Sequence, residues 1–133
     1  MEFSASHMHA RISARKARYV VDLIRGLNVN EALDTLKFIN RRAKPMVVKV
    51  IRSALANAEQ NVDVDIDDLV ISRAVVDEGP LLGGRGRWRP ISRGRAVPIL
   101  KRTSHIKISL SDGSDGADDA ASAADEKADQ ASE

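Results

Sequence analysis

The chain has no cysteine, and aromatic residues make up only 3% of its 133 residues. The missing cysteines exclude a disulfide framework and thiolate chemistry. With so few aromatic side chains, the core has to be built from valine, isoleucine, leucine and alanine. No apolar run approaches the ~18 residues that a membrane helix needs, and the N-terminus shows no signal-peptide hydrophobic region. We therefore expect a cytoplasmic protein with one modest domain.

The net charge of +2 conceals a strong asymmetry along the chain. Residues 111–133 contain eight acidic residues and one lysine, a net charge of −7, and consist mostly of Ala, Asp, Ser and Gly. Such a composition has too little to bury and predicts a disordered acidic tail. The first 110 residues carry 20 basic and 11 acidic residues, a net charge of +9. A basic body of this kind favours a polyanionic partner.

The first 61 residues predict one strand and three helices. Helical spacing of apolar residues follows a candidate N-cap at Ser13, and Gly26 supplies a stop. Pro45 is unfavourable inside a helix, so the third helix is expected to start at Lys44 or to have a bent first turn. The expected elements are an edge strand over Glu2–Arg11 and helices over 13–26, Asn30–Phe38 and from Lys44 to near Asn61.

The remainder of the basic body predicts two strands separated by a long insertion. An acidic turn over 61–68 precedes LVISRAVVDEG at 69–79, which is rich in apolar and β-branched residues, and residues 106–110 alternate with period two. We expect these strands to form an antiparallel pair. The insertion over 83–98 is rich in glycine and contains two prolines, so it is expected to be an extended ribbon or a disordered loop.

No motif indicates catalysis or a resident metal. His7 and His9 form at most half of a metal site, because no further ligands have suitable spacing. Ser104 and His105 are adjacent in a strand and cannot act on one another as nucleophile and base. The acids of the turn over 61–68 lack the glycine and glutamate of a calcium-binding loop. We therefore expect no enzyme, no cofactor and no metal.

Basic side chains in the helical part are candidates for RNA contact. Four arginines follow one another at steps of four, three and seven, which puts the helical ones on a face away from the apolar stripe. The third helix shows a weaker pattern of the same kind. A solvated helix face is the alternative interpretation. The candidates in this part are Arg11, Arg15, Lys16, Arg18, Arg25, Lys49 and Arg52.

The most informative stretch is GGRGRWRPISRGRAVPILKRTSHIK at 83–107, which has eight basic residues and no acidic one. These cations would repel one another in a folded cluster, but along a ribbon each can meet a phosphate. Trp88 has no apolar surroundings in this stretch and suits stacking on a nucleobase. The candidates are Arg85, Arg87, Trp88, Arg89, Arg93, Arg95, Lys101, Arg102, His105 and Lys107.

Several motifs in a fixed order resemble one family. The motifs are SARKARYVVDLIRG at 13–26, EALDTLKF at 31–38, SALANAEQN at 53–61, VDEGP at 76–80, RGRA at 93–96 and LKRTSHI at 100–106. Together they are similar to the bacterial large-subunit ribosomal protein family numbered twenty-two, over roughly His7 to Leu110. In this family the insertion would be slightly longer than usual, and the acidic tail has no counterpart.

The resemblance implies a fold and a function. The fold would be α+β, with three helices packed on a small three-stranded antiparallel sheet and a long β-hairpin over about 77–105. Residues 1–110 would form one RNA-binding domain of the large ribosomal subunit that supports early assembly. Its partners would be large-subunit rRNA, neighbouring ribosomal proteins and the nascent polypeptide, and it would act as a monomer within the ribosome. The hairpin tip would line the exit tunnel with Arg87, Trp88, Arg89, Pro90, Ile91, Ser92 and Arg93.

The residues also leave two other functions open. RGRWRP loosely resembles the arginine-glycine core of hooks that bind the DNA minor groove, although Trp88 interrupts that core. A single-strand RNA chaperone with a flexible basic loop is the other alternative. A ribosomal protein is expected to stay with the large subunit through high-salt washing, whereas either alternative is expected to be removed.

Overall fold

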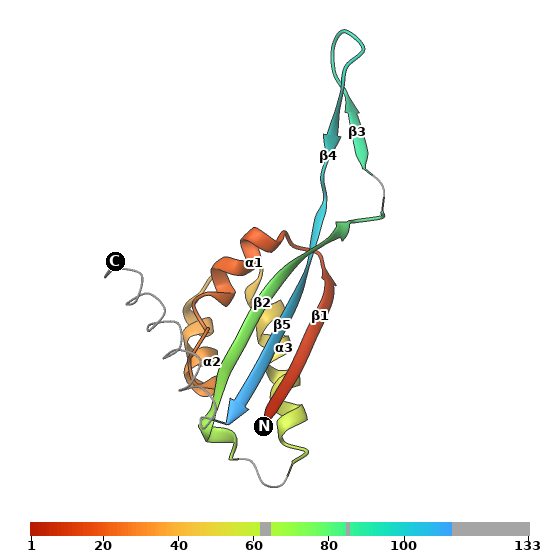
Figure 1. Cartoon of the computed structure of the whole chain (residues 1–133). Helices are drawn as coiled ribbons and strands as arrows, with labels where there is room; N and C mark the ends of the chain where they lie inside the picture. The colour runs from red at the N-terminus through yellow and green to blue at the C-terminus, as the bar shows by residue number, and fades with distance from the viewer. Residues whose placement is uncertain (62–64, 85, 113–133) are drawn as a thin grey trace, which may run out of the picture.

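The computed structural model describes residues 1–61, 65–84 and 86–112. Within these ranges the chain forms an α+β fold in which long strands lie beside three helices (Figure 1). The elements are β1 (Glu2–Ala10), α1 (Ala14–Val21), α2 (Val29–Phe38), α3 (Lys44–Ala58), β2 (Leu69–Leu81), β3 (Arg87–Pro90), β4 (Ala96–Ile99) and β5 (Arg102–Asp112), with a short 3₁₀ turn over Ile66–Asp68. The predicted combination of three helices with a three-stranded antiparallel sheet is confirmed.

The large sheet has the strand order β1-β5-β2, and both pairings are antiparallel. β5 is therefore the central strand and β1 lies at an edge, as predicted. Along β5 the period of two is clear: Ile106, Ile108 and Leu110 are buried, whereas Lys107 is exposed. This alternation gives the sheet one apolar face and one polar face.

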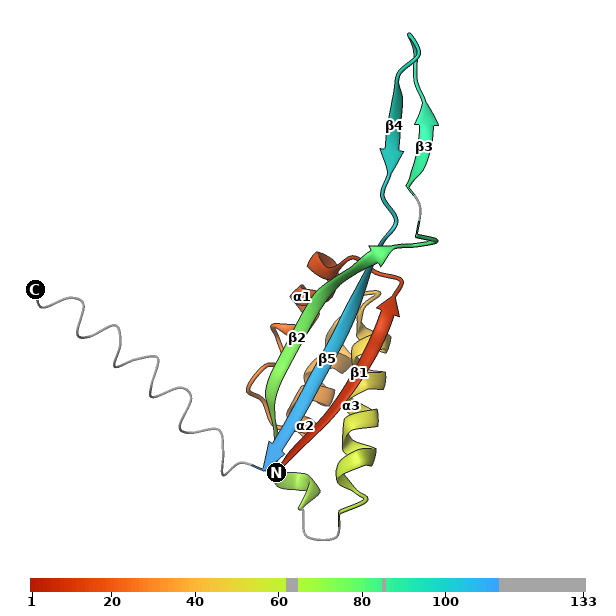
Figure 2. The same ribbon diagram turned by 45° about the vertical axis from the view of Figure 1, so that its right-hand side comes forward.

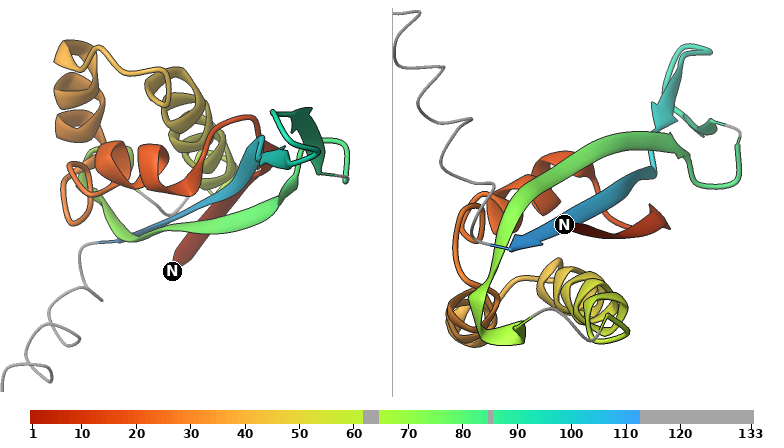
Figure 3. Two further views of the ribbon diagram at one scale, coloured as in Figure 1. Left: turned by 90° about the horizontal axis from the view of Figure 1, so that it is seen from above. Right: turned by 60° about the horizontal axis from the view of Figure 1, so that its bottom comes forward.

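All three helices cover the apolar face of this sheet and leave the polar face open (Figures 2 and 3). α1 packs against β2 and β5, α3 against β1 and β5, and α2 against α3 and β2. The largest fully buried side chains are aliphatic, and Phe3 is the only aromatic residue of the core among the described residues. Each buried Leu, Ile or Val side chain stabilises the fold by about 1.5–3 kcal/mol. The expected aliphatic core is confirmed.

The first helix is shorter than predicted. α1 ends at Val21, and the segment that follows forms turns in which Ile24 N–H donates to the Val21 carbonyl. Gly26, with φ +77°, does not cap this helix. Its N–H instead donates to the Ile71 carbonyl at 3.1 Å, at the outer edge of β2. The helix ends early because the chain must reach that edge.

The other two helices begin close to their predicted positions. α2 spans Val29–Phe38, one residue longer than expected at its start. α3 begins at Lys44 with Pro45 in its first turn. N–H groups in the first turn of a helix have no acceptor within the helix, so the lack of an N–H in proline costs no hydrogen bond there. It ends at Ala58, about one turn before the predicted end.

Beyond the large sheet, β3 and β4 form a separate two-stranded antiparallel sheet that projects away from the domain (Figure 1). Pairing of β2 with β5 ends at Leu81 opposite Arg102, and pairing of β3 with β4 begins at Arg87 opposite Ile99. We call residues 86–99 the arm. Of the two alternatives for the insertion, the structure has the extended ribbon.

Three predictions concern residues outside the described ranges. They are the middle of the acidic turn at 62–64, the candidate RNA contact Arg85, and the tail from residue 113 onward. Ser111 and Asp112, which were assigned to the tail, are the last two residues of β5.

Candidate RNA-binding surface

The arm is a narrow ribbon whose described side chains are all exposed. At its far end the chain reverses over Ser92–Arg95, where Arg93 (φ +60°) and Gly94 (φ +68°) both have left-handed backbone. The register of β3 with β4 centres the reversal on Arg93, so Ser92, Arg93 and Gly94 form a three-residue loop between Ile91 and Arg95. Ile91 N–H donates to the Arg95 carbonyl at 2.8 Å and closes the turn.

The arm's charge is of one sign. Arg87 and Arg89 lie on β3, and Arg93 and Arg95 lie in the turn. No carboxylate forms an ion pair with these arginines within the described part of the chain. Four exposed cations without counter-charge, beside a tryptophan that is 65% exposed, favour binding to a nucleic acid.

The turn does not coincide with the predicted tip. The resemblance placed the tip over 87–93, but the reversal lies at 91–95. Arg87, Trp88 and Arg89 are on β3 below the turn, whereas Gly94 and Arg95 belong to it. The predicted range therefore lies closer to the domain than the turn does. The register of β3 with β4 determines where the turn falls.

A second basic surface lies where the arm leaves the domain. An open cleft of about 610 Å³ is lined by five cations and by no acidic residue. They come from segments far apart in the sequence: the β1–α1 connection, α1, the α2–α3 loop and the start of β5 with the residue before it. The cations of this basic cleft are Arg11, Lys16, Arg42, Lys101 and Arg102.

Arg42 is not among the residues that the sequence predicted, whereas the other four cations of the basic cleft are. It belongs to the exposed pair Arg41-Arg42 directly before α3. The basic run RRAK at 41–44, between two predicted helices, was the available signal. Because the run does not fall on a helix face, spacing arguments did not select it.

Close packing fixes the root of the arm. Gly79 on β2 lies opposite Thr103 on β5. Thr103 is 4% exposed, and its hydroxyl donates to the Pro80 carbonyl. His105 Nδ1 accepts a hydrogen bond from the His9 N–H at 3.0 Å, and the two imidazole rings meet edge to face. His105, predicted to contact RNA, thus joins β1 to β5 beneath the arm.

Two predicted contacts, Arg18 and Arg25, are engaged by the protein itself. Arg18 Nε and Nη2 donate to the Val76 carbonyl at 3.2 and 3.1 Å. Arg25 Nη2 donates to the Ala74 carbonyl at 2.9 Å and pairs with Asp22. Arg25 lies beyond α1, so it does not share the predicted helix face. These arginines hydrogen-bond the outer edge of β2, which would otherwise offer unpaired carbonyls.

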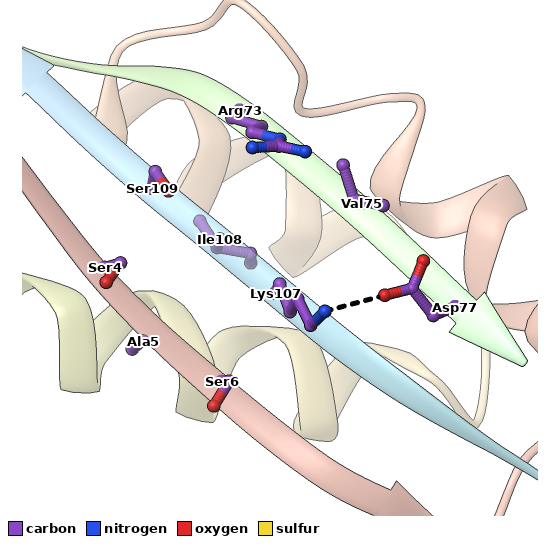
Figure 4. A pocket seen from close by; sticks show the side chains of 9 residues that line it. All are labelled: Ser4, Ala5, Ser6, Arg73, Val75, Asp77, Lys107, Ile108 and Ser109. Carbon is purple, nitrogen blue, oxygen red and sulfur yellow. Dashed lines mark ion pairs between the residues drawn. The ribbon is translucent and has the colours of Figure 1, made fainter. Parts of the chain in front are cut away.

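The open face of the sheet holds Lys107. Figure 4 shows its side chain directed at Asp77 of β2, among the small side chains of a shallow cavity of about 430 Å³. Lys107 Nζ lies 2.9 Å from Asp77 Oδ2. The hydrogen bond from Lys107, and then its positive charge, lower the pKa of the Asp77 carboxyl below its ordinary value. Lys107 is therefore separated from the basic cleft and partly neutralised.

We expect Lys107→Met to raise the pKa of Asp77 toward its ordinary value, measured by carbon-detected NMR titration of the carboxyl group. A carboxyl with a lowered pKa stabilises the fold at neutral pH, and this contribution is lost as pH falls through the folded-state pKa. Because both groups are exposed, the stability difference is expected to be small. Arg73→Met, a more weakly acting cation on the same face, is the matched control. An Asp77 titration unaffected by Lys107→Met would contradict the pairing.

Of the remaining candidates, Arg15 lies on α1, and Lys49 and Arg52 lie on α3. Arg15 is exposed and lines a hollow beside the arm root together with Glu78 and Arg102. Arg52 borders a hollow of about 510 Å³ between α2 and α3, which also contains Asp34. These three residues do not line the basic cleft.

Within residues 1–61, 65–84 and 86–112, no three His, Asp or Glu side chains gather closely enough to hold a metal ion. Over the same residues, no helix combines the length and apolar character that crossing a bilayer requires.

The fold and its charged surfaces define a class of protein: a basic α+β domain whose cations follow a projecting arm and gather at its root. Comparison with known families gives the assignment. The family model for ribosomal protein L22p/L17e matches residues 5–111, which is most of the chain and all of α1–α3. The chain belongs to this family and is thus a structural, rather than catalytic, protein of the large ribosomal subunit.

Proposed function

We propose that the protein binds large-subunit rRNA through the basic cleft and the arm, supports early assembly of the subunit, and lines the nascent-chain tunnel with the end of the arm. The single observation that carries the proposal is the row of exposed, unpaired arginines on a ribbon that makes no contribution to the core. Within the cytoplasmic ribosome, its further partners are neighbouring ribosomal proteins and the nascent polypeptide.

The two basic surfaces have complementary roles in this proposal. The basic cleft lies on the folded domain, where Lys16 belongs to α1 and Arg102 to β5, and it docks the domain onto RNA. The arm then extends from that point, together with the ends of β2 and β5, as the long hairpin predicted over 77–105. A ribbon without a core of its own gains order when RNA packs on both sides of it.

The positive φ of Arg93 supports a functional role for the turn. An L-residue in the left-handed region costs about 1–2 kcal/mol relative to glycine or asparagine. Arginine occupies this position nonetheless. We infer that its charge is used, and that the turn delivers it to the far end of the arm, toward the tunnel.

Subunit fractionation tests the proposal. The tagged full chain, expressed in cells, is expected to co-sediment with the large ribosomal subunit and to remain there through a high-salt wash. A DNA-binding hook or an RNA chaperone would be washed off. Reversing the cleft charges with Arg42→Glu and Lys101→Glu is expected to reduce the bound fraction, with Arg73→Glu on the open sheet face as the control. Release of the wild-type chain by salt alone would overturn the proposal.

Binding of the isolated protein to rRNA fragments is expected to depend steeply on salt. The logarithm of the association constant falls by about 0.7–0.9 per neutralised phosphate for each log unit of salt. Four arm arginines and five cleft cations therefore predict a slope of several units. Filter binding or fluorescence anisotropy over a series of salt concentrations measures it. A flat response would show that phosphate contacts do not dominate.

A further inference from the structure

The register of the arm sorts its side chains onto two chemically different faces. In an antiparallel pair, directly opposite residues project to the same side, and successive residues alternate. Arg87 lies opposite Ile99, and Trp88 lies opposite Pro98. We name the two sides the cationic face (Arg87, Arg89, Val97, Ile99) and the apolar face (Trp88, Pro90, Ala96, Pro98).

The apolar face carries no charge and little hydrogen-bonding capacity. Two of its four residues are prolines, which have no N–H to donate. The indole of Trp88 is 65% exposed, and its Nε1 lies 3.9 Å from where a Cβ of Gly86 would stand. Since Gly86 has no side chain, nothing from that position covers the ring. The result is a flat, accessible surface centred on one tryptophan.

The surrounding charge indicates what this surface binds. Every ionisable side chain of the described arm is an arginine, so the occupant is a polyanion. Among polyanions, nucleic acid presents a flat, uncharged ring next to the charge of every unit. Stacking of a base on an aromatic side chain contributes about 1–3 kcal/mol and does not depend on base identity.

We propose that the apolar face is a nucleobase-stacking site, at which Trp88 stacks on an unpaired base of rRNA and Pro90 and Pro98 pack against its neighbours. The cationic face, on the opposite side, binds the phosphates of a second RNA segment. The arm thus separates two RNA segments and reads a different part of each. This inference rests on the proposed function and adds to it the chemistry of each face.

Trp88 is the only tryptophan of the chain, so its fluorescence reports on the apolar face alone. The full chain is titrated with a short oligouridylate, an oligoadenylate and inorganic polyphosphate. Both oligonucleotides are expected to quench Trp88, because a stacked base quenches indole emission. Polyphosphate, which has charges but no bases, is expected to bind with a similar salt dependence and to leave the emission nearly unchanged.

Substitutions separate the two faces. Trp88→Phe keeps a flat ring and is expected to retain most of the oligonucleotide affinity, whereas Trp88→Leu is expected to lose about 5- to 150-fold. The double variant Arg87→Gln/Arg89→Gln is expected to lower the salt slope by about 1.4, from two phosphates on a single strand, and to keep full quenching at saturation. Thermal melts are expected to be unchanged, since these side chains are exposed.

Three outcomes would overturn the proposal. The first is equal quenching by polyphosphate and by the oligonucleotides. The second is equal affinity of the Phe and Leu variants at position 88. The third is quenching by an uncharged apolar peptide as strong as that by RNA, which would make the face a polypeptide-binding surface. In each case salt-dependent RNA binding persists, so the proposed function stands; if RNA does not bind at all, the proposed function fails instead.

Discussion

Removal of the arm is expected to leave a folded domain that has lost most of its RNA affinity. Leu82 N–H donates to the Lys101 carbonyl at 2.8 Å, so these residues already face each other as hairpin neighbours. Replacing residues 83–100 by Asn-Gly joins them through a two-residue turn of the favoured type. The described side chains of this stretch are exposed. Stability is therefore expected to change by no more than about 1 kcal/mol.

The loss of binding is expected to be large because five arginines leave together with Trp88. The salt slope for rRNA is expected to fall by about 4, and affinity at moderate salt by roughly 100-fold or more. A matched variant that keeps the arm but replaces the five arginines of residues 83–100 by glutamine tests whether charge or length is responsible. Thermal melts and salt titrations are measured on both. Unfolding of the arm deletion would show that the arm belongs to the core.

Gly79→Ala is expected to destabilise the root of the arm. Of the described glycines, Gly79 and Gly86 have a backbone conformation that alanine can adopt, and only at Gly79 would a Cβ clash. A Cβ at this position would stand 2.5 Å from Thr103 Oγ1 and 3.2 Å from His105 Nε2. Thr103 is buried and bonded to Pro80, so it cannot simply rotate away. Overpacking of this kind costs about 1–3 kcal/mol. Chemical denaturation is expected to show that loss.

Gly86→Ala is the matched control for this prediction. Its Cβ would meet only Trp88 Nε1, at an ordinary contact distance of 3.9 Å, and its φ is not positive. It is expected to leave stability unchanged. Adding Thr103→Ala to Gly79→Ala removes the closest clash and is expected to make the two effects non-additive. Equal stabilities of the two alanine variants would show that the root of the arm repacks freely.

Much of the fold follows from local patterns in the sequence. The apolar spacing of α3 fits only a helix, and the alternation of β5 fits only a strand. In the other secondary structure, the same apolar side chains would be exposed to water. The low aromatic content required an aliphatic core, and the core is aliphatic. The end of α1 could not be predicted in this way. Gly26 looks like a helix stop in isolation, but its N–H is used by Ile71, a residue 45 positions later.

Some residues of the candidate site could likewise be predicted from the sequence, and others could not. The arm's arginines could be recognised from the sequence, since a run of cations without a counter-charge favours a polyanionic partner whatever the path of the chain. Arg18 and Arg25 show the opposite case. Their spacing indicated an exposed helix face, but tertiary packing brings the β2 carbonyls within hydrogen-bonding distance.

The sequence by itself determined the order of the helices and long strands, the composition of the core and the cationic character of the arm, because each depends on residues near one another in the chain. The fold class was implied by the resemblance of several motifs to one family. Tertiary structure alone decided three things: that Arg42 joins Arg11 and Lys101 in the basic cleft, that Lys107 pairs with Asp77, and which side of the arm carries Trp88. These depend on how distant segments pack and on strand register, where a shift of one residue exchanges the two faces.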